Sequence, residues 1–348
     1  MIYRHLKLKL TKVQEESVHR WIPSLTSIWN WAICKIENDS KGGIYYSQKE
    51  FQNILCGTSK VLNIPSHTVQ GVLISAHMAW QMCYKKAAKK PRFKGNRNRL
   101  NSIPFPDPFR VPKDNRITVP GLGRVRYHKQ DIPEGKIKCG RVVKRASGWY
   151  LCLFIDAEPA KISGTGEGAV GIDPGYKHLL TLSTGEKVAH PKELQHSIKR
   201  IGQAQRGGNK RLVARLNERI ANQRKDRNHK LSHRLVAENA VIAFSKDNIK
   251  GLSRAGFGKS VAAAGHGQFR LMLAYKSRAG GRQYIEVPSK GSTRTCSTCG
   301  ASTGPQGRAG LSVRQWTCSA CGTPHDRDVN AAINTLNAAL GMSVERAI

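Results

Sequence analysis

Two pairs of cysteines constrain the fold of this chain more than any other feature of its sequence. They read Cys296-Ser-Thr-Cys299 and Cys318-Ser-Ala-Cys321, with residues 300–317 between them. Each CxxC turn directs two sulfurs toward one point, and two such turns complete a tetrahedron. The spacing predicts a structural zinc ribbon, because four thiolates leave no open coordination position. Two disulfides are the alternative, which a reducing compartment disfavours. His325 lies nearby, but four thiolates suffice without it.

The rest of the sequence indicates a globular cytoplasmic protein with no membrane partner. Hydrophobic residues make up 39% of the 348 residues, and no apolar run approaches the ~20 residues that a membrane-spanning helix needs. The first residues, MIYRHLKLKL, alternate leucine with lysine, which is typical of a strand and not of a signal peptide. The five other cysteines are scattered, so we expect them to be reduced and structural.

The charge of the chain predicts a nucleic-acid partner. Lys and Arg number 58 against 23 Asp and Glu, which gives a formal net charge of +35. The alternative is a merely solvated basic surface. A globular protein with this charge would repel itself strongly unless a polyanion neutralised it. Phosphates are the partner that such an excess of cations favours.

Hydrophobic periodicity divides the first half of the chain into a helical and a β-rich segment. Residues 11–90 carry apolar side chains at the helical period, starting from a capping box at Thr11 and Gln14. Residues 100–160 carry short β-rich runs between Pro and Gly turns, which is typical of an antiparallel barrel or sandwich. If the strand predicted at 2–10 joins that sheet, the helical segment is an insertion in it.

The second half predicts a mixed α/β sheet flanked by helices. From residue 169, a strand–turn–strand unit is followed by further elements of alternating type. These are a basic helix at 205–237, a strand at 241–244, a helix near 265–279 and a strand at 284–287.

Two aspartates are candidates for a catalytic metal site. Asp173 closes the first strand of this sheet, and Asp328 lies at the start of the last predicted helix. Carboxylates at these places can converge on one point, and carboxylate oxygens suit Mg²⁺. Two such ions can stabilise the attacking and leaving oxygens in phosphodiester cleavage. Such sites usually need at least three acids, and either residue could instead be a simple turn or helix-cap aspartate.

The motifs together resemble the TnpB family, transposon-associated RNA-guided nucleases related to type V CRISPR effectors. The resemblance covers nearly the whole chain. It rests on the two CxxC pairs and on PRFKG at 91–95, ITVPGLGRVR at 117–126, IKCGRVVKRASGWYLCL at 137–153, GIDPG at 171–175, HKLSHRLV at 229–236 and DRDVNAA at 326–332.

The resemblance implies a multidomain α/β architecture and two nucleic-acid partners. An RNase H-like (RuvC) mixed sheet would occupy 163–291 and 325–348, with the zinc ribbon inserted at 292–324. A β-barrel wedge domain would occupy 1–10 and 91–162, with a helical recognition domain inserted at 11–90. The partners would be a guide RNA from the transposon end and a target DNA, beside which the protein reads a short duplex motif. Base pairing with the guide would read the target sequence.

The second acidic motif of the family is altered in this chain. The family places Glu-Asp-Leu after the strand that is 241–244 here, a few residues before a segment like NIKGL. Anchoring on NIKGL at 248–252 puts Ser245 where the glutamate belongs. A hydroxyl is a poor substitute for a carboxylate on Mg²⁺. Of the nearby acids, Glu238 is expected to be solvated, and Asp247 is short and lies past the strand end.

Glu286, in the next predicted strand, is the candidate replacement. Some branches of the family resemble this chain in having a glutamate there. A parallel strand covered by helices should be apolar, so an acid in it calls for an explanation. Adjacent strands lie ~4.8 Å apart, so a glutamate on either strand could reach the same pair of metal ions. The predicted Mg²⁺ ligands and catalytic residues are Asp173, Glu286 and Asp328. Asp328 is preferred to Asp326 because it stands two residues before the motif asparagine; for Glu286, a harmless edge residue is the alternative.

Two basic segments are predicted to contact nucleic acid. Residues 85–99, KKAAKKPRFKGNRNR, interleave Phe93 with cations, which favours a backbone-tracking loop over a solvated one. The helix at 205–237 has only Glu218 and Asp226 to pair with its cations, which favours contact with a guide–target heteroduplex over a salt-bridged solvent helix. The predicted contacts are Arg92, Lys94, Arg206, Lys210, Arg211, Arg215, Arg219, Arg224 and Lys230.

We therefore expect an RNA-guided, Mg²⁺-dependent DNA endonuclease with water as the nucleophile. The alternative, motivated by Ser245, is a nuclease-dead RNA-guided DNA-binding protein such as a repressor. A strand-transferring transposase is disfavoured, because no nucleophilic tyrosine is convincingly placed. A monomer is favoured, although the sequence leaves the oligomeric state, the guide, the flanking motif and the cut positions open.

Overall fold

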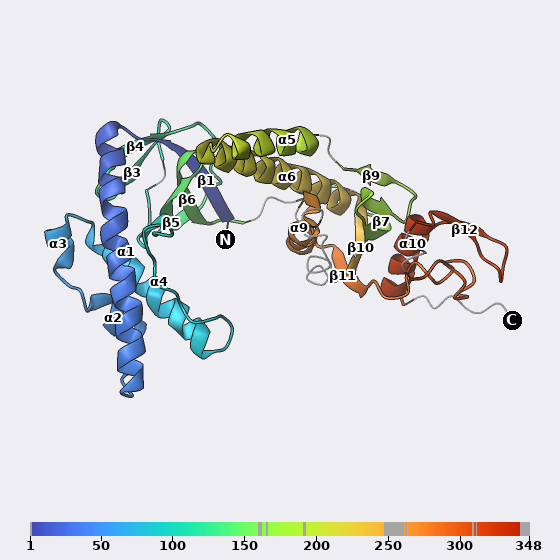
Figure 1. The fold of residues 1–348 in the computed structure, drawn as a ribbon, viewed down its shortest axis with the longest axis horizontal. Coiled ribbons are helices and arrows are strands. Elements are labelled where there is room, and N and C mark those ends of the chain that lie inside the picture. The colour runs from blue at the N-terminus through green and yellow to red at the C-terminus, as the bar shows by residue number, and fades with distance from the viewer. Residues whose placement is uncertain are drawn as a thin grey trace. The chain divides into compact units, whose positions relative to one another are not determined.

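The computed structural model describes residues 2–110, 112–158, 162–164, 166–190, 193–246, 261, 263–307, 310 and 312–341. The chain divides into two compact units, Met1–Pro159 and Ala160–Ile348 (Figure 1). Among the described residues, no helix combines the length and the apolar character needed to cross a bilayer.

One six-stranded antiparallel sheet organises the first unit. Its order is β2-β5-β6-β1-β4-β3, so the N-terminal strand pairs with strands more than a hundred residues away, as the sequence allowed. Both neighbours of β1, namely β6 and β4, run antiparallel to it. The strands are β1 (Ile2–Lys9), β2 (Ser102–Phe105), β3 (Arg116–Val119), β4 (Gly123–Tyr127), β5 (Lys136–Arg145) and β6 (Gly148–Asp156).

The helices of the first unit share one apolar core with this sheet. They are α1 (Lys12–Lys41), α2 (Gln48–Asn53), α3 (Thr58–Leu62) and α4 (Ser66–Tyr84). The predicted capping box is present, because the Thr11 side chain accepts from the Gln14 backbone and the Gln14 side chain accepts from the Thr11 backbone. Leu25 of α1, Leu73 of α4 and Leu153 of β6 are fully buried in the same cluster.

A five-stranded mixed sheet organises the second unit, as the sequence predicted. Its order is β11-β10-β7-β8-β9; β10 runs parallel to β7 and β11, whereas the neighbours on the β8 side are antiparallel. The strands are β7 (Gly168–Pro174), β8 (His178–Leu182), β9 (Lys187–Ala189), β10 (Asn239–Lys246) and β11 (Gln283–Pro288). Within the described residues, β11 is therefore an edge strand with one side unpaired.

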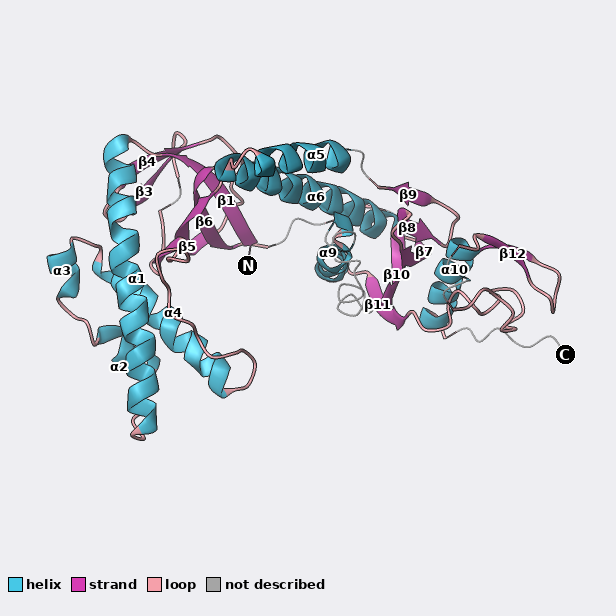
Figure 2. Ribbon diagram, viewed as in Figure 1, coloured by secondary structure: helices cyan, strands magenta, loops and turns pink. Residues whose placement is uncertain are grey.

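Helices cover both faces of this sheet (Figure 2). Val170 and Ile172 of β7 pack into a core with Leu235 of α6 (Lys210–Glu238) and Phe269 of α9 (His266–Ala279). The opposite face carries α10 (Arg327–Ala339), which approaches so closely that a Cβ on Gly171 would lie 2.0 Å from the Ala332 carbonyl oxygen. The small β12 (Gln315–Thr317) and β13 (Pro324–Asp326) pair with each other in the cysteine-rich segment.

The basic helix predicted at 205–237 is two helices, which corrects that expectation. α5 (Glu193–Arg206) ends at the glycine pair 207–208, and α6 begins at Lys210. Gly208 has a φ of +65°, a conformation that ends helices and suits glycine. The Asn209 side chain then accepts a hydrogen bond from the Leu212 N–H and starts α6.

Candidate metal centres and basic surfaces

The four cysteines of the two CxxC pairs lie together. Their sulfurs are all within 4.8 Å of one another, with Cys296 to Cys321 at 3.8 Å and Cys299 to Cys318 at 3.7 Å. Disulfide-bonded sulfurs are about 2.05 Å apart, whereas a tetrahedron of Zn–S bonds of about 2.3 Å has edges of about 3.8 Å. The cluster could therefore hold a zinc ion.

A glycine follows the second cysteine of each pair and closes the turn. The N–H of Gly300 donates to the Cys296 carbonyl at 3.0 Å, and that of Gly322 donates to the Cys318 carbonyl at 2.8 Å. Both glycines have positive φ, +73° and +72°, which other residues adopt only with strain. The CxxCG pattern was therefore a second signal for the turns.

The close approach of the sulfurs shifts the pKa values of the thiols in opposite directions. The Thr303 hydroxyl, 3.1 Å from Cys318 Sγ, helps lower the pKa of that thiol to about 6. For Cys299, the Ala301 N–H lowers the pKa, but burial and the three neighbouring sulfurs raise it by more. The net result is a pKa of about 12. Four thiols this close cannot all ionise unless a positive charge offsets their repulsion, which a bound divalent metal provides.

His325 reaches the same cluster, although the four-cysteine pattern did not predict it as a ligand. Its Nε2 lies 3.0 Å from Cys296 Sγ, and its ring packs on Trp316 with centroids 4.7 Å apart. Burial lowers the pKa of His325, so the neutral ring can still donate one N–H to the thiolate. The CxxC spacing alone gave no signal for this contact.

Two asparagines fasten α10 to the cysteine-rich segment. The side-chain amides of Asn330 and Asn334 both donate to the carbonyls of Ser292 and Thr295, at 2.7–3.2 Å. Asn330 is 1% exposed, and its Oδ1 accepts from the Ser297 N–H at 2.8 Å. The asparagine of the DRDVNAA motif therefore joins the cysteine cluster to the helix that carries the motif acid.

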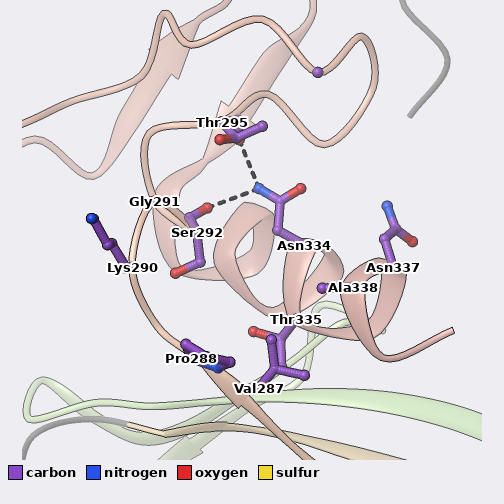
Figure 3. A pocket seen from close by; sticks show the side chains of 11 residues that line it. Val287, Pro288, Lys290, Gly291, Ser292, Thr295, Asn334, Thr335, Asn337 and Ala338 are labelled. Atoms are coloured by element: carbon purple, nitrogen blue, oxygen red, sulfur yellow. Dashed lines mark hydrogen bonds between the residues drawn. The ribbon is translucent and has the colours of Figure 1, made fainter. Parts of the chain in front are cut away.

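A hollow of about 320 Å³ lies beside these bonds, between the end of β11, the loop after it and α10 (Figure 3). Its lining offers amides, hydroxyls and one lysine but no carboxylate, so these residues do not form a magnesium site. The lining residues are Val287, Pro288, Lys290, Gly291, Ser292, Thr295, Gly300, Asn334, Thr335, Asn337 and Ala338.

Asp173 lies on the α10 face of the sheet. It stands two residues after Gly171, which contacts α10, and alternate residues of a strand share a face. Across the sheet, Asp173 pairs with Thr181, and Thr181 pairs with Lys187. These residues therefore form one row across the α10 face. Asp173 is half-buried at the C-terminal end of β7.

Ser245 lies in the same row on the other side of Asp173. Because Phe244 pairs with Ile172, the next residue of β10 is level with the next residue of β7. Ser245 is completely buried, and its hydroxyl has no hydrogen-bond partner among the described residues. The predicted alternative Asp247 and the NIKGL segment at 248–252 lie outside those residues.

The start of α10 lies over the same end of the sheet, because Lys187 Nζ is 2.5 Å from Asp326 Oδ2. Asp326 caps the helix by accepting from the N–H groups of Asp328 and Val329. Burial raises the pKa of Asp326, but Lys187 and the two N–H groups lower it further. The Asp326 carboxylate therefore serves as the N-cap of α10 and pairs with Lys187. The Asp328 carboxylate is 3.4 Å from the Arg314 guanidinium.

Glu286 belongs to a different row. It pairs with Phe244, which pairs in turn with Ile172, so its side chain lies on the α9 face of the sheet. There its carboxylate is 3.2 Å from Lys246 Nζ and 3.3 Å from Arg270 Nε.

The register therefore does not bring Glu286 together with Asp173. β11 is an edge strand, so a charged residue on it is less costly than in a covered strand. In the described parts of the chain, no three acidic side chains come within metal-binding distance of one another. The role of Glu286 as a metal ligand stays a prediction.

The predicted phosphate contacts on α5 and α6 differ in exposure. Arg206, Lys210 and Arg211 surround the break between the helices and are exposed. Arg224 is half-buried beside Gly265, and Lys230 pairs with Asp226 at 2.8 Å. Arg215 and Arg219 are exposed on α6; in the first unit, Arg92 is exposed and Lys94 is half-buried after α4.

Two family models match the chain from residue 156 onward. A model described as "Probable transposase" matches residues 156–255. A second, described as "Cas12f1-like, TNB domain", matches residues 266–335, which include the cysteine cluster and most of α10.

Curated relatives match over most of the chain. A "Putative RNA-guided DNA endonuclease" from Streptomyces pristinaespiralis is 32% identical over 304 residues, which cover 82% of this chain and 73% of the relative. The corresponding InsQ protein of Escherichia coli K12 is 26% identical and covers 93% and 89%. A "TnpB-like protein L79" of Acanthamoeba polyphaga mimivirus is 26% identical and covers 54% and 41%.

Among solved structures, a cryo-EM structure of a Cas12f1–sgRNA–target DNA complex matches at a TM-score of 0.39 and 16% identity, covering 97% of this chain and 99% of that one.

Proposed function

Because the chain belongs to the TnpB family, we propose that it is an RNA-guided DNA endonuclease associated with a transposon. The observation that carries this proposal is the identity to the Streptomyces relative over most of both chains. The positions of the motif acids support it, since Asp173 lies at the end of β7 and Asp328 lies in the first turn of α10.

The partners in this proposal are a guide RNA from the transposon end and a target DNA. The net charge of +35 supports this pairing, as do the exposed cations around the α5–α6 break. The guide would read the target by base pairing, while the protein holds the heteroduplex by its backbone. We propose that the protein acts as a cytoplasmic monomer.

Two metals complete the proposal. The four cysteines would hold a structural zinc ion. Asp173 and Asp328 would hold Mg²⁺, which when bound stabilises the attacking and leaving oxygens of the scissile phosphodiester. Among the residues that the structure describes, the buried hydroxyl of Ser245 has no hydrogen-bond partner, which supports an ion or a water at this face. Glu286 is the third ligand predicted from sequence, and it would have to leave Lys246 and Arg270 to serve there.

Cleavage of matched DNA by the RNA complex tests the activity and its ligands. We expect Asp173→Asn and Asp328→Asn to slow cutting by at least about 100-fold, since even outer-shell partners of metal ligands typically contribute about 10–100-fold. Binding of the guide and the target should persist. Glu238→Gln, a change of an exposed acid at the end of α6, is the matched control.

The same assay decides the role of Glu286. Wild-type cutting by Glu286→Gln would remove it from the ligand set without affecting the two aspartates. Wild-type cutting by both aspartate variants would overturn the magnesium site as a whole.

A nuclease-dead, RNA-guided DNA-binding protein is the second candidate. Ser245 in the place of an acid favours it, and so does the engagement of Glu286 by Lys246 and Arg270. This candidate predicts tight binding of matched DNA by the wild-type complex, with no cleavage at any Mg²⁺ concentration.

A further inference from the structure

The loop after α4 presents an exposed aromatic ring among cations. Phe93 is 55% exposed and lines a hollow of about 410 Å³ with Lys89, Lys90, Pro91 and Arg92. Residues 85–99 contain eight Lys and Arg and no Asp or Glu. An exposed aromatic ring set among cations is the combination of groups that proteins use to bind single-stranded nucleic acid.

The backbone on both sides of Phe93 is held by α1. The Asn30 side chain donates to the Lys94 carbonyl and accepts from the Lys94 N–H, each at 2.8 Å. The Trp29 Nε1–H donates to the Arg92 carbonyl at 3.2 Å. Lys94 Nζ also lies 6.0 Å from the centroid of the Trp29 ring. Because α1 is anchored in the core, these contacts fasten the loop to the body of the first unit.

We propose that Phe93 is a stacking platform for one unpaired base of a bound nucleic acid, with Arg92 and Lys94 on the adjoining phosphates. Asn30 and Trp29 act as positioning residues for this platform. The inference rests on the proposed function only in requiring a nucleic-acid partner. Stacking on an aromatic ring is independent of base identity, which suits a protein whose sequence recognition belongs to a guide.

The composition of the loop favours a nucleic acid over other partners. Phe93 is the one large apolar side chain in residues 85–99, which is too little to anchor a membrane surface. Cations stand on both sides of it. A base beside its phosphates presents a flat apolar face flanked by negative charge, which complements this arrangement.

Base-dependent binding by the full-length protein tests the platform. The probes are labelled uridine RNA and thymidine DNA oligonucleotides, and the same strands with abasic sugars. We expect Phe93→Ala to weaken binding of the base-containing strand about tenfold, to leave the abasic strand nearly unaffected, and to be rescued by Phe93→Trp. The RNA and DNA arms identify which strand uses the platform.

Two further variants separate positioning from loss of fold. Asn30→Ala should reproduce part of the Phe93→Ala defect and add little to it when the two are combined, because both act on the same ring. Tyr45→Ala removes another exposed ring of the first unit, 69% exposed, and should change neither binding constant.

The outcomes are distinct from those of the cleavage assay. Equal weakening of base-containing and abasic strands by Phe93→Ala, or no weakening of either, would overturn the stacking platform. In the second case a protein partner for Phe93 would replace it. Base-dependent binding by a wild-type protein that cuts no DNA would sustain this inference while the nuclease proposal failed.

Discussion

The hydroxyl of Ser245 is buried at the end of β10 and has no hydrogen-bond partner in the part of the chain that the structure describes. Leaving a buried polar atom unsatisfied costs about 1–3 kcal/mol, so such atoms usually meet a water or an ion. Ser245 lies beside Asp173 on the face that carries α10, which is where the proposed magnesium site would place such a water or ion. A hydrated ion at this face would give the hydroxyl a partner.

If Ser245 lies at the proposed magnesium site, a carboxylate there should strengthen it. We expect Ser245→Glu to lower the Mg²⁺ concentration for half-maximal cleavage about tenfold, because affinity for a hard cation rises with the number of charged ligands. The measurement is the cleavage rate against Mg²⁺ concentration. Ser245→Gln has the same size without the charge and controls for crowding of a buried site. Identical Mg²⁺ dependence of the two variants would contradict the placement.

At the scale of elements, signals that act within one segment were readable from sequence. The capping box at Thr11, the cysteine turns and the mixed sheet were predicted on such signals. The break of the basic helix was missed, although Gly207-Gly208-Asn209 is a stop signal followed by a cap. The face of Glu286 could not be read, because it depends on the register of β11 against β10 and on β11 being an edge strand.

Removal of zinc should loosen α10, because its two asparagines bind carbonyls in the segment that leads into Cys296. We expect a zinc-selective chelator to release zinc and to raise amide hydrogen exchange in α10 at least about tenfold. Cys321→Ser should act in the same way. Cys56→Ser, at an exposed cysteine of the first unit, should have no effect. Zinc release with unchanged exchange in α10 would show that the hydrogen bonds of the two asparagines do not depend on the metal.

At the scale of the whole molecule, the type of sheet was more predictable than the packing of helices against it. The mixed sheet followed from strand patterns, whereas these patterns left open whether the N-terminal strand joins the first sheet, as β1 does. The helical segment at 11–90, however, shares its core with the first sheet. A Cβ on Gly121, next to β4, would lie 2.7 Å from the Trp21 ring of α1. Such contacts join residues a hundred positions apart, and periodicity within a segment carries no information on them.

The net charge of +35 predicts that binding of guide RNA by the whole protein depends strongly on salt concentration. Each phosphate that the protein neutralises releases counterions, so the logarithm of the affinity for guide RNA should fall linearly with the logarithm of salt concentration. We expect Arg211→Gln and Arg215→Gln, which change exposed residues of α6, each to reduce that slope by about one. The measurement is RNA affinity between roughly 50 and 200 mM salt, the range over which such binding is most sensitive. Lys138→Gln is the matched control, because this lysine already pairs with Asp156 at 3.0 Å. Equal slopes in all three variants and the wild type would show that α6 does not contact phosphates, and the basic helix would then serve only to keep this face solvated.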